Sequence, residues 1–272
     1  MEHARSDDPL LEPAMWKLFR NFFNLAEKRR RWSIEDDIPW EQCNKNLSPA
    51  VADVVESFCA VELYLPDYLL HAIPWSRPSR ARTWFYANWG YEESKHSMAL
   101  NDWLLRSGHR NEERMADLDN DIYAHPWNMP HDNVVAMLGY TMVQERATAL
   151  NYRNLRRRIQ EAGGDPALEK LLMLLAVDEQ MHHSFFMGAV RLYLELDRDS
   201  TLEQLRRVMN HFSMPAIHAL ADGKQRMTRI KELKIFDDEA YFKDVYVPLL
   251  QELGIQRSEM RTRLPSKKSA PL

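Results

Sequence analysis

Two Glu-x-x-His segments constrain the fold of this chain more than any other feature of its sequence. In one, Glu93 precedes His96, and in the other, Glu179 precedes His182. Side chains three residues apart on a helix lie on one face, with Cβ atoms about 5–6 Å apart, so each pair can offer a carboxylate oxygen and an imidazole nitrogen to the same ion. With 21 Glu and 10 His among 272 residues, random placement would give about 0.8 such pairs. Two pairs, each inside a segment with a helical pattern, therefore predict a shared site.

Two further glutamates, Glu62 and Glu145, sit among apolar neighbours in the middle of other helical segments. A buried carboxylate costs several kcal/mol unless it is paired or bound to metal, and several facing one another protonate unless a cation neutralises them. Four helices, two giving Glu and two giving Glu-x-x-His, form the pattern of a ferritin-like di-metal bundle. Four carboxylates would balance two divalent ions, and this oxygen and nitrogen donor set suits iron or manganese rather than structural zinc.

The competing interpretation is a helical interaction protein without metal, because a single glutamate on a helix is usually a solvated surface charge. That interpretation predicts that no iron co-purifies with the protein. It also predicts that Glu145→Ala is neutral or stabilising in metal-free buffer.

Composition favours one soluble helical domain spanning residues 1–272, with mobile tails at residues 1–12 and 259–272. The chain has only eight glycines, 45% hydrophobic and 28% charged residues, which is typical of a globular protein. Its longest apolar run, residues 171–177, is far shorter than the roughly 20 residues that cross a bilayer. The acidic N-terminal residues lack the apolar core of a secretion signal, so none is expected, and two cysteines fit a reducing cytoplasm. The net charge of −4 argues against general nucleic-acid binding.

Capping and helix-breaking residues place the expected helices along the chain. The segment at 109–131 is rich in Asn, Asp, His and Pro, and it is expected to be the long crossover connection between two helix pairs. Ser200 and Glu203 have capping-box spacing, and Asp237 or Asp238 is a candidate cap for a last helix. The expected helices span residues 11–31, 48–70, 79–108, 132–161, 166–196, a stretch from 200, and 239–253.

Five short motifs resemble those of the soluble acyl-acyl-carrier-protein desaturases, over roughly residues 32–255. The resemblance includes the intervals of 31, 52 and 34 residues between Glu62, Glu93, Glu145 and Glu179. Gln144–Thr148 reads Q-E-R-A-T, a five-residue match to the family. The other matches are Glu62–Tyr68 to E-x-x-L-P-x-Y, Trp89–His96 to W-x-x-E-E-N-R-H, Asp178–His182 to D-E-K-R-H, and Ser213–Ala216 to S-M-P-A.

This resemblance implies a centre of two iron ions, with manganese as an alternative, in which Glu93 and Glu179 bridge the metals. It further implies that Asp178 hydrogen-bonds a ligand histidine, that Trp32, Asp178 and His96 carry electrons, and that Thr148 places a hydroxyl beside the oxygen-binding face. A homodimer is also implied. The implied metal ligands are Glu62, Glu93, His96, Glu145, Glu179 and His182.

The implied activity is O₂- and electron-dependent desaturation, which introduces a cis double bond into a fatty-acyl chain on acyl carrier protein, with a ferredoxin-type electron donor. Inward residues are expected to line an acyl tunnel or simply to pack the core: Phe85, Met98, Met142 and Phe186. Because carrier proteins are acidic, Arg153–Arg158 and Lys28–Arg31 are candidate docking patches. Solvated charges at helix ends are the alternative interpretation of both.

The chain departs from the family pattern beside the second Glu-x-x-His pair. His183 stands where the family has Glu, and Gln180-Met181 replaces a Lys-Arg pair. Two other di-iron functions therefore stay open. One is a hydroxylase or N-oxygenase acting on a carrier-tethered intermediate of secondary metabolism, and the other is a ferroxidase or iron-storage bundle.

Overall fold

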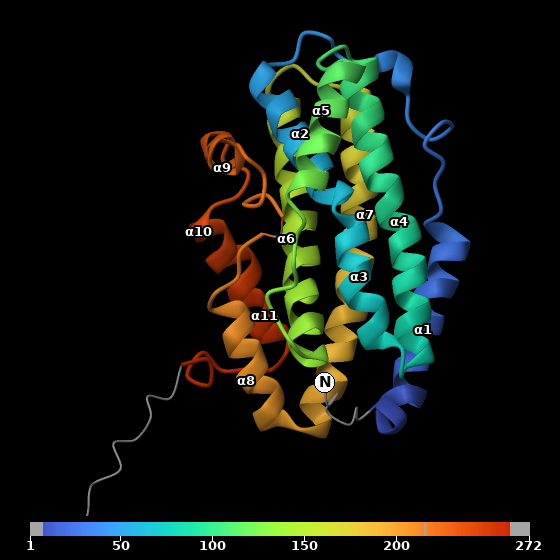
Figure 1. Cartoon of the computed structure of the whole chain (residues 1–272), viewed down its shortest axis with the longest axis vertical. Helices are drawn as coiled ribbons and strands as arrows, with labels where there is room; N and C mark the ends of the chain where they lie inside the picture. The colour runs from blue at the N-terminus through green and yellow to red at the C-terminus, as the bar shows by residue number, and fades with distance from the viewer. Residues whose placement is uncertain (1–7, 215, 262–272) are drawn as a thin grey trace, which may run out of the picture.

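Four long helices, aligned side by side along the long axis, form the centre of the molecule in this computed structural model, which describes residues 8–214 and 216–261 (Figure 1). They are α2 (Pro49–Leu63), α4 (Arg80–Arg106), α6 (Val134–Glu161) and α7 (Pro166–Leu196). α2 packs on α4, and α6 packs on α7. The described residues form helices and loops without strands, so the all-α prediction is confirmed.

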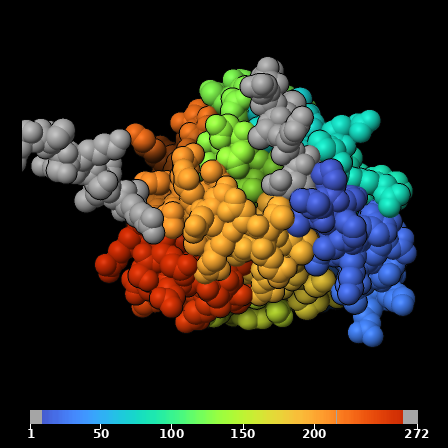
Figure 2. Space-filling model, turned by 90° about the horizontal axis from the view of Figure 1, so that it is seen from below, coloured from blue at the N-terminus to red at the C-terminus, as the bar shows by residue number. Residues whose placement is uncertain are grey.

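The remaining elements surround this bundle. α1 packs against α4 and α7, α8 against α6 and α7, and α9 against α2. Seen from below, α1 and the C-terminal segment lie on opposite sides of the end of α7 (Figure 2). The surrounding elements are α1 (Asp8–Arg29), a 3₁₀ turn (Trp40–Gln42), α3 (Leu65–Ser76), α5 (Glu112–Ala124), α8 (Arg198–Met209), α9 (Gly223–Glu232), α10 (Asp238–Ala240), a π-helical turn (Tyr241–Tyr246) and α11 (Val247–Glu252).

Capping side chains set the starts of bundle helices α2, α4 and α7. Ser48 accepts a hydrogen bond from the Ala50 amide, and Ser79 accepts one from the Arg82 amide. Asp165 likewise caps α7. Such caps satisfy amides that have no partner within the helix.

The helix predicted over 48–70 is broken at Tyr64, between α2 and α3. Pro66 has no amide hydrogen to donate to the carbonyl of Glu62, and its ring would clash there. Glu62 therefore lies in the last turn of α2.

The predicted crossover at 109–131 is only partly a connection, since it contains α5. Met115, Leu118 and Ile122 have helical spacing and are buried, which explains this helix although most of its other residues are polar or charged. α8 begins before the predicted Ser200 cap, because Asp197 is the capping residue and accepts from the Ser200 amide.

The expected mobile tails are too long at both ends. Leu11 is buried, and the carboxylate of Glu12 accepts hydrogen bonds from Ser79 Oγ at 2.6 Å and from the Ala81 amide at 2.9 Å. Met260 is also buried. Residues 1–7 and 262–272 of the predicted tails lie outside the described residues.

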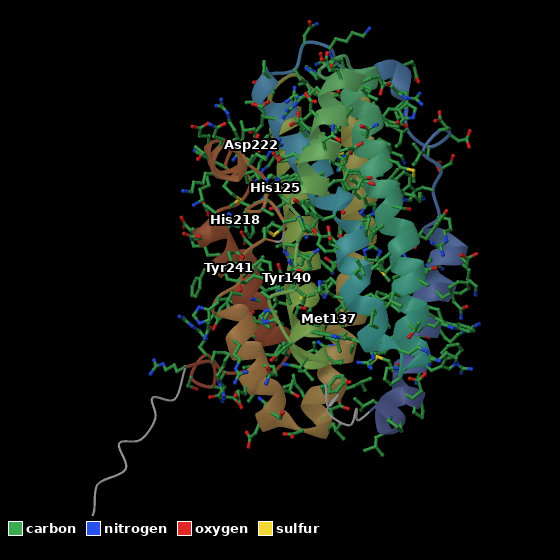
Figure 3. The ribbon with its side chains drawn as sticks, in the orientation of Figure 1. His125, Met137, Tyr140, His218, Asp222 and Tyr241 are labelled. Atoms are coloured by element: carbon green, nitrogen blue, oxygen red, sulfur yellow. The ribbon has the colours of Figure 1, made fainter. Side chains whose placement is uncertain are left out.

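A row of aromatic rings attaches the C-terminal segment to α6. Phe212 contacts Tyr140 on one side, with ring centroids 5.5 Å apart, and stacks on Tyr241 on the other at 5.4 Å (Figure 3). The Tyr241 hydroxyl also donates to the Met209 carbonyl. No helix in the described ranges combines the length and apolarity that crossing a membrane requires.

Candidate metal centre

All six predicted ligands meet in the interior of the bundle, and all six are buried. α2 and α6 each supply a glutamate, whereas α4 and α7 each supply a Glu-x-x-His pair. Their donor atoms form two overlapping groups, and within each group the atoms lie within 4.8 Å of one another. The His96 half-site consists of Glu62, Glu93, His96 and Glu179, and the His182 half-site consists of Glu93, Glu145, Glu179 and His182.

Glu93 and Glu179, the two predicted bridges, are the residues common to both half-sites. Each is the first residue of a Glu-x-x-His pair. Because residues three apart lie on the same face of a helix, each glutamate points to the same region as its histidine. Sharing two carboxylates is the geometry that a pair of adjacent metal ions requires.

The inward-facing atoms of the cluster lack hydrogen-bond partners, which fits a metal centre. Both oxygens of Glu145 form no hydrogen bond, and neither do Oε1 of Glu93, Oε1 of Glu179 or Nδ1 of either histidine. They are crowded nonetheless, with His182 Nδ1 only 2.9 Å from Glu93 Oε1 and 3.3 Å from Glu145 Oε2. Buried polar atoms are normally paired, and cations at the centre would satisfy all of these at once.

The outward nitrogens of the histidines, by contrast, each face a carboxylate. Nε2 of His96 lies 3.4 Å from Asp178 Oδ2, and Nε2 of His182 lies 2.7 Å from Glu92 Oε2. A carboxylate that accepts from Nε2–H leaves the Nδ1 lone pair facing inward, where it can bind metal.

Burial raises the pKa of two glutamates in the cluster. Burial and the nearby charges of Glu93 and Glu179 raise the pKa of Glu62 well above its usual value, and burial with Glu179 does the same to the pKa of Glu145. Burial opposes ionisation of Glu179, but contacts with Glu145 and the two histidines lower its pKa to about 2.

The histidines are protonated for a related reason. Burial alone would lower the pKa of His96, but Glu93, Asp178 and Glu179 outweigh it and raise that pKa well above the usual value. The carboxylates around His182 raise its pKa in the same way. The raised pKa values thus favour protons on groups whose charge two divalent ions could balance instead.

Trp32, Asp178 and His96 form a continuous chain of contacts, as the resemblance implies. Trp32 Nε1 donates to Asp178 Oδ2 at 2.8 Å, and the same oxygen faces His96 Nε2. The indole of Trp32 is buried beneath the ammonium of Lys95, which lies 3.8 Å from its ring centroid.

An apolar pocket reaches the cluster at Glu62, and Thr148 is in its wall. The Tyr152 hydroxyl, also in this wall, donates to Glu62 Oε1. One wall of the pocket comes from α9 and its neighbouring loops, where the sequence analysis predicted no site residue. This region can be found in Figure 3 by the labelled residues His218 and Asp222, on the outer side of α6. The pocket is lined by Phe58, Val61, Glu62, Thr148, Asn151, Tyr152, Met214, Ile217, Met227, Ile230 and Phe236.

The four residues expected to line a tunnel are not in this pocket. Met98 is 49% exposed on the outside of α4, so its prediction is wrong. Phe85 and Phe186 pack against each other with centroids 5.1 Å apart, and Met142 is buried in the core. Their role is core packing.

Glu92 and Arg30 are functional candidates that the sequence did not single out. Arg30 hydrogen-bonds both Glu92 and Asp178, and Arg31 bonds Glu92 and Asn88. The predicted docking patch at Lys28–Arg31 is therefore wrong for its last two arginines, which point into the protein. The one available signal for Glu92 was its place in the E-E pair of the Trp89–His96 motif.

The fold and the site together define a ferritin-like helical bundle built around a buried carboxylate–histidine cluster. The family described as fatty acid desaturase matches residues 70–261, and the chain belongs to this family of oxidoreductases. The crystal structure of DesA2 from Mycobacterium tuberculosis H37Rv, described as a putative acyl-ACP desaturase, is similar over 93% of this chain and 98% of its own, with a TM-score of 0.69 and 19% identity. A Mn/Fe form of an R2-like ligand-binding oxidase covers 94% and 99%, with a TM-score of 0.60 and 19% identity.

Relatives known by sequence carry acyl-carrier-protein desaturase names. DesA1 of Mycobacterium tuberculosis is 21% identical over 92% of this chain and 78% of its own length. A chloroplastic stearoyl-acyl-carrier-protein 9-desaturase of Linum usitatissimum is 31% identical over 81% of this chain and 64% of its own length. The chain therefore spans less than two thirds of that plant relative.

Proposed function

We propose that this chain is a di-iron desaturase that uses O₂ and electrons to introduce a cis double bond into a fatty-acyl chain carried on acyl carrier protein. The observation that carries the proposal is the position of Glu62, which belongs to the buried cluster and also lines the apolar pocket. The pocket has an open volume of only about 20 Å³, so an acyl chain would have to part its walls to bring methylene groups beside the metals.

In this proposal, the four carboxylates and the two Nδ1 atoms would hold two iron ions, and Glu93 and Glu179, which belong to both half-sites, would be shared between them. Bound iron, once reduced, supplies the activation of O₂ that removal of hydrogen from an unactivated methylene requires. The balanced reaction removes one hydrogen from each of two neighbouring carbons, and O₂ with two electrons and two protons becomes two molecules of water.

The protein's own residues orient the reactants and exclude water. Phe58, Ile217 and Ile230 form apolar walls that would hold a flexible chain in one position, which is a large part of catalysis when reacting atoms must be aligned. Tyr152 fixes the carboxylate of Glu62 through its hydroxyl. Thr148 supplies the hydroxyl that the resemblance places beside the oxygen-binding face.

Electrons would reach the centre through Trp32, Asp178 and His96 from a ferredoxin-type donor. The candidate docking site for the carrier protein is a groove lined in part by Arg153, Arg156, Leu172 and Val177. Its two arginines suit an acidic partner. We further propose a homodimer in the cytoplasm, as the resemblance implies.

The test is anaerobic loading with Fe²⁺, followed by turnover of acyl-carrier substrates with ferredoxin, its reductase and O₂. The proposal expects products that have lost two hydrogens by mass analysis. Ile230→Phe, which fills the pocket, is expected to lower kcat/KM by about 10-fold or more without changing iron content. Lys231→Ala, an exposed change on the same helix, is the control and should match the unaltered protein.

Two outcomes would favour the other functions. Incorporation of ¹⁸O from ¹⁸O₂ into the acyl product would replace desaturation with hydroxylation as the main reaction. Uptake of many more than two iron ions per chain, with no change in any acyl substrate, would favour iron storage.

A further inference from the structure

The two carboxylates behind the ligand histidines are arranged crosswise between α4 and α7. His96 on α4 faces Asp178 on α7, whereas His182 on α7 faces Glu92 on α4. Each of these carboxylates immediately precedes a predicted bridging glutamate in the chain. Each half-site therefore depends on an acid from the opposite helix to set the orientation of its imidazole.

Arg30 connects these two carboxylates. Its Nη1 donates to Asp178 Oδ1 and to Glu92 Oε2, the latter at 3.1 Å, and its Nη2 donates to Glu92 Oε1 at 3.0 Å. The side chain is 6% exposed, and its guanidinium carbon lies 5.0 Å from the centroid of the Phe22 ring. A planar guanidinium presents several donors in a fixed geometry, which a lysine ammonium cannot reproduce.

Neighbouring cations do not share this position. Arg31 reaches Glu92 but not Asp178, and Lys95 donates to the carbonyl of Trp32. Arg29 is exposed. Within residues 8–214 and 216–261, Arg30 is the basic side chain that hydrogen-bonds both carboxylates.

We infer that Arg30 is a positioning residue common to both half-sites, which holds Asp178 and Glu92 directed at His96 and His182 so that both Nδ1 atoms face the metals. The reason is geometric: one guanidinium donates to both carboxylates and so fixes where their oxygens lie relative to the two Nε2 atoms. This inference rests on the proposed metal centre and assigns the control of both its histidines to the residue that directly follows α1, outside the four-helix bundle.

Anaerobic titration with Co²⁺, followed by its visible absorption, tests the inference without any turnover. The unaltered protein should bind two ions in resolvable steps. Asp178→Asn should weaken one step and Glu92→Gln the other, each by about 10- to 100-fold, the usual effect of losing the partner of a ligand histidine. Arg30→Gln should weaken both steps and shift both absorption bands, whereas Arg29→Gln should change neither.

Arg30→Lys is a second test, because it keeps the positive charge but loses the planar group that donates to both carboxylates. It should weaken both binding steps, but less than Arg30→Gln does. If circular dichroism of the metal-free protein shows that Arg30→Gln does not fold, Arg30→Lys serves as the test in its place. Wild-type affinity in Arg30→Lys would then overturn the inference. It is also overturned if Arg30→Gln folds and weakens one step only, or matches Arg29→Gln. Failure of the unaltered protein to bind any Co²⁺ would instead reject the proposed metal centre itself.

Discussion

Trp32 and Asp178 are separated by 146 residues, yet the indole Nε1–H donates to the carboxylate across 2.8 Å. The bond joins the loop that follows α1 to the middle of α7. The same carboxylate oxygen also faces His96, so Asp178 connects the indole ring of Trp32 to the buried cluster. Burial opposes ionisation of Asp178, but His96 and Arg30 outweigh it and lower the pKa of this carboxyl to about 2.

Trp32→Phe tests the electron route. The substitution keeps an aromatic ring but removes the donor to Asp178, so we expect slower reduction of the iron centre by the protein donor, by about 10-fold, with unchanged iron content. Stopped-flow measurement of centre reduction reports the effect directly. Loss of bound iron in this variant would assign Trp32 a role in assembling the site instead.

Glu145→Gln is expected to change stability in opposite directions with and without metal. In metal-free buffer it replaces a buried carboxyl whose two oxygens have no hydrogen-bond partner, so the free energy of unfolding should stay equal or rise by about 1 kcal/mol. With Fe²⁺ present, the variant should lose much of the stabilisation that binding gives the unaltered protein. Urea unfolding with chelator and with Fe²⁺ measures both. A large loss of stability in chelator would contradict the metal-centre proposal.

Metal binding should release protons and weaken as the pH falls. The raised pKa values of Glu62, Glu145, His96 and His182 favour the protonated forms of these groups in the metal-free protein. Two divalent ions must displace the protons that these groups hold, so affinity should increase with rising pH. Calorimetric titration with Mn²⁺ in buffers of different ionisation enthalpy counts the protons. Glu145→Gln should release about one fewer, and no proton release in either protein would contradict the charge distribution described for the site.

Glu56 should supply stability that is lost in acid, independently of the metal centre. Burial opposes its ionisation, but hydrogen bonds from Arg114, Arg110 and Arg226 outweigh it and lower its pKa to about 2. Because the folded-state pKa is depressed, this stability is present above the usual value near 4.5 and disappears as the pH falls toward 2.

Glu56→Gln is the matching substitution. It should cost about 3 kcal/mol near pH 7, since the arginines then lack their buried partner, and it should flatten the dependence of unfolding free energy on pH between about 5 and 2. Chemical denaturation across that range is the measurement. A slope equal to that of the unaltered protein would show that other carboxylates govern acid stability.

The helical class and the six side chains that converge in the interior could be predicted from the sequence, because both depend on local periodicity. Glu93 and His96, like Glu179 and His182, share a face of whatever helix contains them, since 3.6 residues make one turn. The caps at Ser48, Ser79 and Asp165 are equally local. Local composition also explains why α5 was not predicted. Residues 109–131 are mostly polar, and only three buried positions in this segment show helical spacing.

Contacts between distant segments were decided by the tertiary structure. Arg30 looked like one of four cations at a helix end, and its partners lie 62 and 148 residues further along the chain. The apolar pocket likewise needs α9 to lie against α2, an arrangement with no short-range signature. The position of a residue in the helical repeat determines which face of its helix the side chain occupies. Only the packing of the helices determines which charged group or cavity lies next to that face.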